Sequence, residues 1–126
     1  LPTGIVAGDV IVLVSAIGTS GTRTMPAGWT RFLVNTGTGI DGWVRLADGT
    51  EGASVTLTLS VGSTCVCIVY RISGTDVASV SGDFADASGG DPPSHTAPRD
   101  GPNLWIAAER TLRRSRLTDQ RAFQGF

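Results

Sequence analysis

The sequence predicts an all-β protein, an antiparallel β-sandwich of the jelly-roll type. Short runs of Val, Ile, Thr and aromatic residues are separated by turns that contain Gly, Pro or Asp. The 17 glycines among 126 residues, together with many Ser and Thr, favour strands and tight turns over helices. Strand patterns are not followed by helical patterns, so the βαβ units of a parallel sheet are not expected.

The stretch from Glu51 to Gly74 predicts a β-hairpin. Apolar and polar residues alternate over Val55 to Leu59, which is typical of a strand with one wet face. Val61-Gly62-Ser63 supplies a short reversal of the length that suits a hairpin. The return strand, Thr64 to Ile72, is apolar on both faces, which predicts a place in the middle of a sheet packed against a second layer.

Four further strands are expected, over Val10 to Ala16, Thr30 to Asn35, Gly42 to Ala47 and Asn103 to Ala108. The first is apolar on both faces and is therefore predicted to be central. Asp48-Gly49 is a strong turn signal. Together these elements predict one sandwich domain over residues 1–108.

The chain changes character after Gly74. Asp76 to Pro98 is rich in Gly, Ser, Asp and Pro, which predicts a long surface excursion with one short strand near Ala78 to Ser81. Residues 109–126 carry a net charge of +3, against −4 for the rest of the chain. For this Arg-rich tail a short helix, an added strand and disorder all remain open.

Charge and composition exclude some classes of function. The formal net charge of −1 argues against a general nucleic-acid binder, which would be strongly basic. The longest apolar run, Val10 to Ile17, is far short of the ~20 residues that span a bilayer. Cys65 and Cys67 are two apart on a predicted strand, so we expect them to point the same way as small buried hydrophobic side chains in a protein made in a reducing cytoplasm.

The residues that could carry chemistry are few. His95 is the single histidine, and no nucleophile-elbow motif accompanies it, so a solvated loop histidine is expected. Asp83, Asp86 and Asp91 lie in a Gly-rich loop but match no calcium-binding pattern. We therefore predict no catalytic residue, no cofactor and no metal site.

The tryptophans are candidates for a ligand platform, since exposed indole rings can stack on sugars. Trp29 and Trp105 adjoin strongly apolar strands, which favours a place in the core. For Trp43 the sequence leaves both possibilities open, core residue or ligand platform.

Five motifs occur in a recognisable order. They are Gly8-Asp9, Pro26-Ala27-Gly28-Trp29-Thr30, Arg45 to Glu51 (RLADGTE), Ile72 to Asp76 (ISGTD) and Pro92 to Thr96 (PPSHT). This order resembles the β-sandwich domains in accessory virion proteins of tailed bacteriophages, which occur as capsid decoration proteins and as minor tail or fibre modules. The resemblance extends over about Leu1 to Ala108.

The resemblance implies a non-enzymatic protein of the virion, assembled in the bacterial host cytoplasm. It implies a capsid decoration or cement protein on the outer capsid surface, with the major capsid protein or other virion proteins as partners, and with a homo-oligomer such as a trimer as one possible form. No nucleic-acid or membrane partner is expected. The contact regions would be the loop from Asp76 to Pro98 and the arginines of the tail, facing an acidic surface: Arg110, Arg113, Arg114, Arg116 and Arg121.

Two alternatives stay open. The first is a tail or fibre module, which the same resemblance allows. The second is a carbohydrate-binding module for host recognition, with Trp43 as its platform. The family pattern would continue with more strands after Ala108, whereas this chain continues with the Arg-rich tail, so a neighbouring molecule could complete the sandwich by adding a strand.

Overall fold

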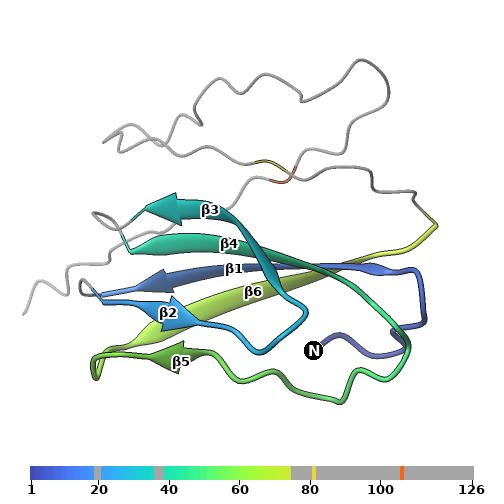
Figure 1. Ribbon diagram of the computed structural model, residues 1–126, viewed down its shortest axis with the longest axis horizontal. Coiled ribbons are helices and arrows are strands. Elements are labelled where there is room, and N and C mark those ends of the chain that lie inside the picture. Colours follow the sequence, from blue (N-terminus) through green and yellow to red (C-terminus); the bar gives the residue numbers. More distant parts are fainter. Residues whose placement is uncertain (19–20, 36–38, 75–80, 82–105, 107–126) are drawn as a thin grey trace, which may run out of the picture.

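The computed structural model describes residues 1–18, 21–35, 39–74, 81 and 106. This part of the chain is all-β and contains two antiparallel sheets (Figure 1). The larger sheet has the strand order β3-β4-β1-β6, with β1 at Val10–Ile17, β3 at Thr30–Asn35, β4 at Ile40–Leu46 and β6 at Cys65–Ile72. The smaller sheet pairs β2 (Arg23–Thr24) with β5 (Thr58–Leu59).

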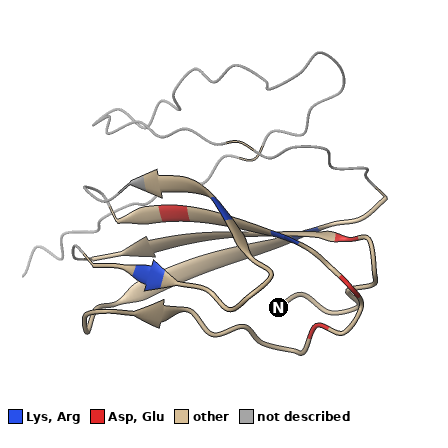
Figure 2. Ribbon diagram, in the orientation of Figure 1, with Lys and Arg blue, Asp and Glu red and all other residues tan. Residues whose placement is uncertain are grey.

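Strand β1 is the centre of the larger sheet, as its apolar sequence predicts. It pairs with β4 on one side and with β6 on the other, and at its end the Ile17 amide donates to the carbonyl of Gly39, directly before β4, at 2.9 Å. Ile11 and Leu13 are almost completely buried. Figure 2 shows that β1 carries no charged residue, which fits a strand that is enclosed on both edges.

The predicted hairpin between Glu51 and Gly74 is wrong. Strand β5 does not pair with β6; it pairs with β2 in the smaller sheet, while β6 pairs with β1 in the larger one. The residues between Leu59 and Cys65 therefore cross from one sheet to the other. The alternation over Val55 to Leu59 reports which face of the segment is buried, and it carries no information about which strand is the partner.

The central position predicted for the return strand is not observed among the described residues. In the described part of the chain, β6 is the end strand of its sheet, and Val66 and Ile68 are 61% and 41% exposed. Two further strand predictions agree with the structure fully or nearly so. Thr30 to Asn35 is confirmed. The strand predicted over Gly42 to Ala47 is observed at Ile40–Leu46, so it begins two residues and ends one residue earlier than predicted.

The core is a cluster that joins side chains of the larger sheet to residues next to β2 and β5. Leu13 on β1 lies directly across from Trp43 on β4 and Val69 on β6, and Met25, just after β2, completes the buried cluster. Val55 and Leu57, just before β5, pack against it. Burying a side chain of this size stabilises the fold by about 1.5–3 kcal/mol, so this cluster holds both sheets together.

The predicted strands at Ala78 to Ser81 and at Asn103 to Ala108 lie outside the described residues, apart from Ser81 and Ile106. Among the described residues, we find no helix with the length and apolar character needed to cross a membrane.

Candidate functional site

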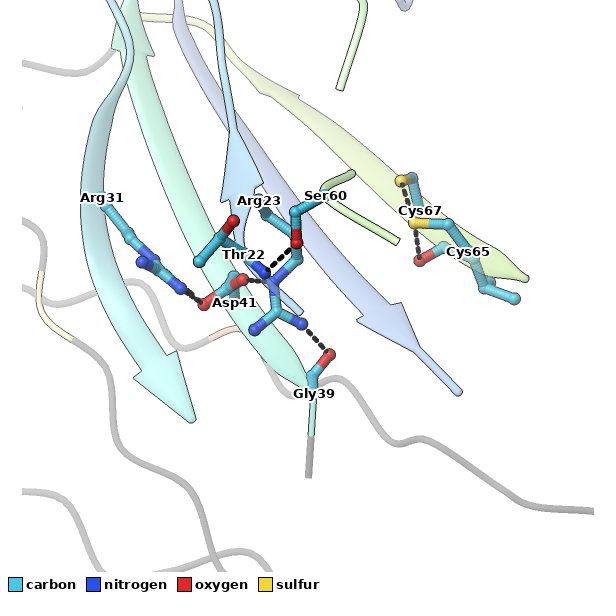
Figure 3. Close-up of polar contacts among 9 residues, drawn as sticks. Thr22, Arg23, Arg31, Gly39, Asp41, Ser60, Cys65 and Cys67 are labelled. Atoms are coloured by element: carbon cyan, nitrogen blue, oxygen red, sulfur yellow. Dashed lines mark hydrogen bonds and ion pairs between the residues drawn. The ribbon is translucent and has the colours of Figure 1, made fainter. Parts of the chain in front are cut away.

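A cluster of three charged side chains lies between the sheets, and we call it the ion triad (Figure 3). Asp41 on β4 is fully buried and contacts an arginine on each side. Its Oδ2 pairs with Nε of Arg23 on β2, and its Oδ1 accepts hydrogen bonds from Nη2 and Nε of Arg31 on β3, the latter at 3.0 Å. Arg23 Nη1 also donates to the carbonyl of Gly39 at 2.6 Å. The ion triad thus ties β2 of the smaller sheet to β3 and β4 of the larger one.

The ion triad carries an excess of positive charge, because two arginines share one carboxylate. Burial, reinforced by the charge of Arg31, lowers the pKa of Arg23. Burial also lowers the pKa of Arg31, whose guanidinium carbon lies 5.0 Å from the ring centroid of Trp43. Arginine remains protonated in proteins nevertheless, so the cluster keeps a net charge of +1 inside the fold.

Next to the ion triad lies Ser15, at the centre of the larger sheet. It is 0% exposed, and it faces Asp41 on β4 and Cys67 on β6 as its direct cross-strand neighbours. Within the described part of the chain, Ser15 Oγ makes no hydrogen bond. Since a buried hydroxyl without a partner costs about 1–3 kcal/mol, this position is a polar site in an otherwise apolar strand.

The two cysteines lie side by side on β6. Their sulfurs are 3.5 Å apart and both thiols are free, so the prediction that they point the same way is confirmed (Figure 3). The prediction that both are buried is wrong, since Cys65 is half-buried and Cys67 is exposed at the end of the sheet. Partial desolvation, a hydrogen bond with Cys65 and the charge of Cys65 raise the pKa of Cys67 to about 11.

The turn at Asp48–Glu51 is built by carboxylates that accept backbone hydrogen bonds. Asp48 Oδ1 accepts from the Thr50 amide at 2.8 Å, and the Glu51 carboxylate accepts from the Asp48 and Gly49 amides at 2.9 and 3.0 Å. Arg45 forms ion pairs with both acidic side chains. Gly49 has a φ of 86°, as the turn predicted at Asp48-Gly49 requires. Both carboxylates therefore have partners within the turn or on Arg45, and their role is to stabilise the turn.

A second buried carboxylate fixes the start of the chain to β6. Asp9 accepts hydrogen bonds from the Val6 amide at 2.9 Å and from Arg71 Nε at 2.6 Å. The hydrogen bond from Val6 and the interactions with Arg71 lower the pKa of Asp9 against the opposing effect of burial. Arg71 also reaches the carbonyl of Thr3 at 3.3 Å.

An open depression of about 270 Å³ is lined by residues 1–5 and 51–53. The amino group of Leu1 crosses it to the carbonyl of Ala53 at 2.7 Å. The described residues contain no group of three or more His, Cys, Asp or Glu side chains that could hold a metal ion. Glu51 is the only titratable side chain that lines this depression, and it already accepts the hydrogen bonds of its turn.

The candidate residues predicted from the sequence are dispersed. Trp43 is 6% exposed in the core cluster, so its ring offers no open face to a sugar. Trp29 is half-buried and packs against the same cluster, as predicted. The other candidates lie outside the described residues: Trp105, His95, Asp83, Asp86, Asp91, Arg110, Arg113, Arg114, Arg116 and Arg121.

The ion triad was not predicted from the sequence. One signal was present, because Asp41 is a charged residue between Ile40 and Gly42-Trp43, in a strand whose other charged residue is Arg45. A charge in that position needs a partner. The comparisons add no relative: no family model, no curated protein and no solved structure matches this chain.

Proposed function

We propose that this protein is a non-enzymatic structural protein of a bacteriophage virion, a capsid decoration or cement protein that binds the outer capsid surface. The ordered motifs from Gly8-Asp9 to Pro92–Thr96 support the proposal through their resemblance to accessory virion proteins. The two antiparallel sheets with a shared core are consistent with the jelly-roll-like sandwich that we propose for the complete domain.

The observation that carries the proposal is the apolar outer face of the larger sheet. The register places Val12, Val44 and Tyr70 in one row on the face opposite Leu13 and Trp43. Every other residue that this face presents on β1, β4 and β6 is also apolar or glycine: Val10, Val14, Ala16, Ile40, Gly42, Leu46, Val66, Ile68 and Ile72. Val10 and Val12 on β1 are buried, at 2% and 5% exposed, whereas Leu46 at 67%, Val66 at 61% and Ile68 at 41% are exposed, so the open part of this face lies at β6 and at the end of β4.

Val66 and Ile68 are neighbours on this face of β6, whereas Leu46 lies across from Val10 at the other end of β1. Neighbouring exposed apolar side chains such as Val66 and Ile68 are typical of protein–protein contact surfaces. In the described part of the chain, β6 also has one edge without a strand partner. A capsid subunit could bury these side chains and add a strand to that edge, at a gain of about 25 cal/mol for each Å² of apolar surface removed from water. Binding to assembled capsid alone would then stabilise the lattice by mass action.

Co-sedimentation with capsids that lack this protein tests the proposal. The wild-type protein should pellet with the capsids and raise their melting temperature. The double substitution Val66→Asp with Ile68→Asp should abolish pelleting, whereas Val61→Asp, at a 41% exposed position outside the strands, should bind as wild type. A wild-type protein that stays in the supernatant at every concentration would overturn the proposal.

A tail or fibre module is the second candidate, because the resemblance includes such modules. Electron microscopy of virions separates the two: icosahedrally arranged copies on the capsid support decoration, and density at the tail supports the module. Carbohydrate binding has less support, since the burial of Trp43 removes the platform proposed for it. Contact through the arginines of the tail and assembly into a trimer remain parts of the proposal, to be located in the same maps.

A further inference from the structure

The two cysteines of β6 form an isolated pair. They are the only cysteines in the chain, both thiols are free, and their sulfurs lie 3.5 Å apart. Cys67 is exposed to solvent, so a small ligand can reach the pair from outside the fold. The proposed binding face does not include them, because they lie on the side of the sheet that carries Leu13 and Val69.

The strand geometry favours a bridging atom over a direct disulfide. Alternate residues of a strand are separated by about 6.6 Å between Cα atoms and their Cβ atoms point the same way. A disulfide requires Cβ atoms about 3.8 Å apart, so closing it would distort β6. Two sulfur–metal bonds of about 2.3 Å each span sulfurs about 4.6 Å apart when the three atoms are in line. The observed separation of 3.5 Å is shorter, so a rotation of the exposed Cys67 side chain has to widen it when the metal binds.

The surroundings of the pair contain an unpartnered hydroxyl and a cluster of charges. Ser15, with its buried and unpartnered hydroxyl, is the direct neighbour of Cys67 on β1. The ion triad, with its net charge of +1, begins one strand further at Asp41, and Arg23 interacts electrostatically with Cys65. A monovalent cation held by two thiolates carries a net charge of −1. Because the raised pKa of Cys67 favours its neutral thiol, the bound metal has to displace the thiol proton.

We propose that Cys65 and Cys67 form a two-thiolate site for one soft monovalent cation of the Cu(I) type, with the Ser15 hydroxyl donating to the Cys67 thiolate. Soft thiolates select such ions over hard ones, and Cu(I) accepts two ligands. On binding, two S–H bonds break, two S–Cu bonds form and two protons pass to solvent. The metal and both sulfurs keep their oxidation states.

An anaerobic titration of the full chain with Cu(I), buffered by a chromophoric Cu(I) chelator, tests the site. We expect one Cu(I) per chain and the loss of both thiols to a colorimetric thiol reagent. Cys65→Ser and Cys67→Ser should each weaken Cu(I) binding by on the order of 10²-fold or more, because either change removes the second, intramolecular contact. Ser15→Ala should weaken it by on the order of 10-fold, and Ser63→Ala, in the turn before β6, should leave it unchanged.

Phenylarsine oxide, which bridges two neighbouring thiols, provides a measurement that needs no substitution. The wild-type protein should take up one arsenical per chain and then no longer bind Cu(I). Arsenical uptake without Cu(I) retention would overturn the proposal. So would two Cu(I) ions per chain, or single-cysteine variants that bind Cu(I) as tightly as wild type.

Discussion

Asp41 on β4 and Arg23 on β2 form a buried ion pair that links the two sheets, with side chains 0% and 1% exposed. Asp41 also neutralises part of the charge of Arg31. Replacement by Asn removes the only carboxylate of the ion triad and leaves two buried or half-buried cations without a counter-charge. We expect Asp41→Asn to lower the free energy of unfolding by about 3–5 kcal/mol, as measured by urea denaturation.

Asp48→Asn is the matched control for that experiment. Its ion pair with Arg45 is exposed, with the Asp48 side chain at 58%, and Asn keeps an oxygen for the Thr50 amide. An exposed ion pair contributes at most about 1 kcal/mol. Equal losses in the two variants would contradict a structural role for the ion triad.

Gly42 is required by its neighbour Phe32. A Cβ at position 42 would lie 2.5 Å from Cζ of the Phe32 ring and 3.0 Å from Cβ of Leu33. We expect Gly42→Ala to destabilise the fold by about 1–3 kcal/mol through overpacking, measured as a shift of the urea midpoint. Gly52→Ala, where the added Cβ meets nothing within 4 Å, should change little. Phe32→Leu should reduce the cost of Gly42→Ala in a double-mutant cycle, and strict additivity would show that the two residues do not interact.

Asp9 predicts a loss of stability in acid. The pKa of Asp9 in the folded protein lies below the ordinary value of an aspartate, so Asp9 binds a proton less readily when folded than when unfolded. Its contribution is present above about pH 4 and disappears as the pH falls through the lower, folded pKa. The free energy of unfolding between pH 7 and pH 2 should therefore fall less steeply for Asp9→Asn than for wild type. An unchanged slope would contradict the prediction.

Cys67 should be a slow nucleophile at neutral pH. Its pKa of about 11 leaves the thiol protonated, and the thiolate is the reactive form. The rate of alkylation by iodoacetamide, followed by mass spectrometry of the intact chain, should rise with pH until about pH 11. Cys65→Ser should shift this profile to lower pH, because it removes the coupled thiol. A plateau for the wild type near pH 8 would contradict this.

The elements that were predicted correctly are those whose own residue types indicate their environment. Val10 to Ala16 is apolar on both faces, and it lies at the centre of its sheet as β1. The turn at Asp48-Gly49 needs a glycine and has one. In both cases the residue types alone determine the environment that the segment needs, so the local sequence was sufficient for the prediction.

The local sequence did not allow us to predict which strands pair when they are distant in the chain. Cys65–Ile72 is as apolar as β1, yet β6 lies at the end of the described sheet, because apolar composition reports burial or contact and does not identify the partner. The ion triad was missed for a related reason. Its members come from three strands, and only the register brings Arg23 and Arg31 to the same carboxylate.

The position of β1 also has a consequence for synthesis. Both of its partners come later in the chain: β4 begins 30 residues after β1 does, and Val10 pairs with Ile72. Strand β1 is therefore synthesised before β4 and β6. Its second edge can form hydrogen bonds only after the chain has been synthesised through β6. Such non-local pairing is slow to form, and during this interval β1 exposes a strand edge that favours aggregation. A pause in translation before residue 72 would therefore lengthen the time during which this edge of β1 is open.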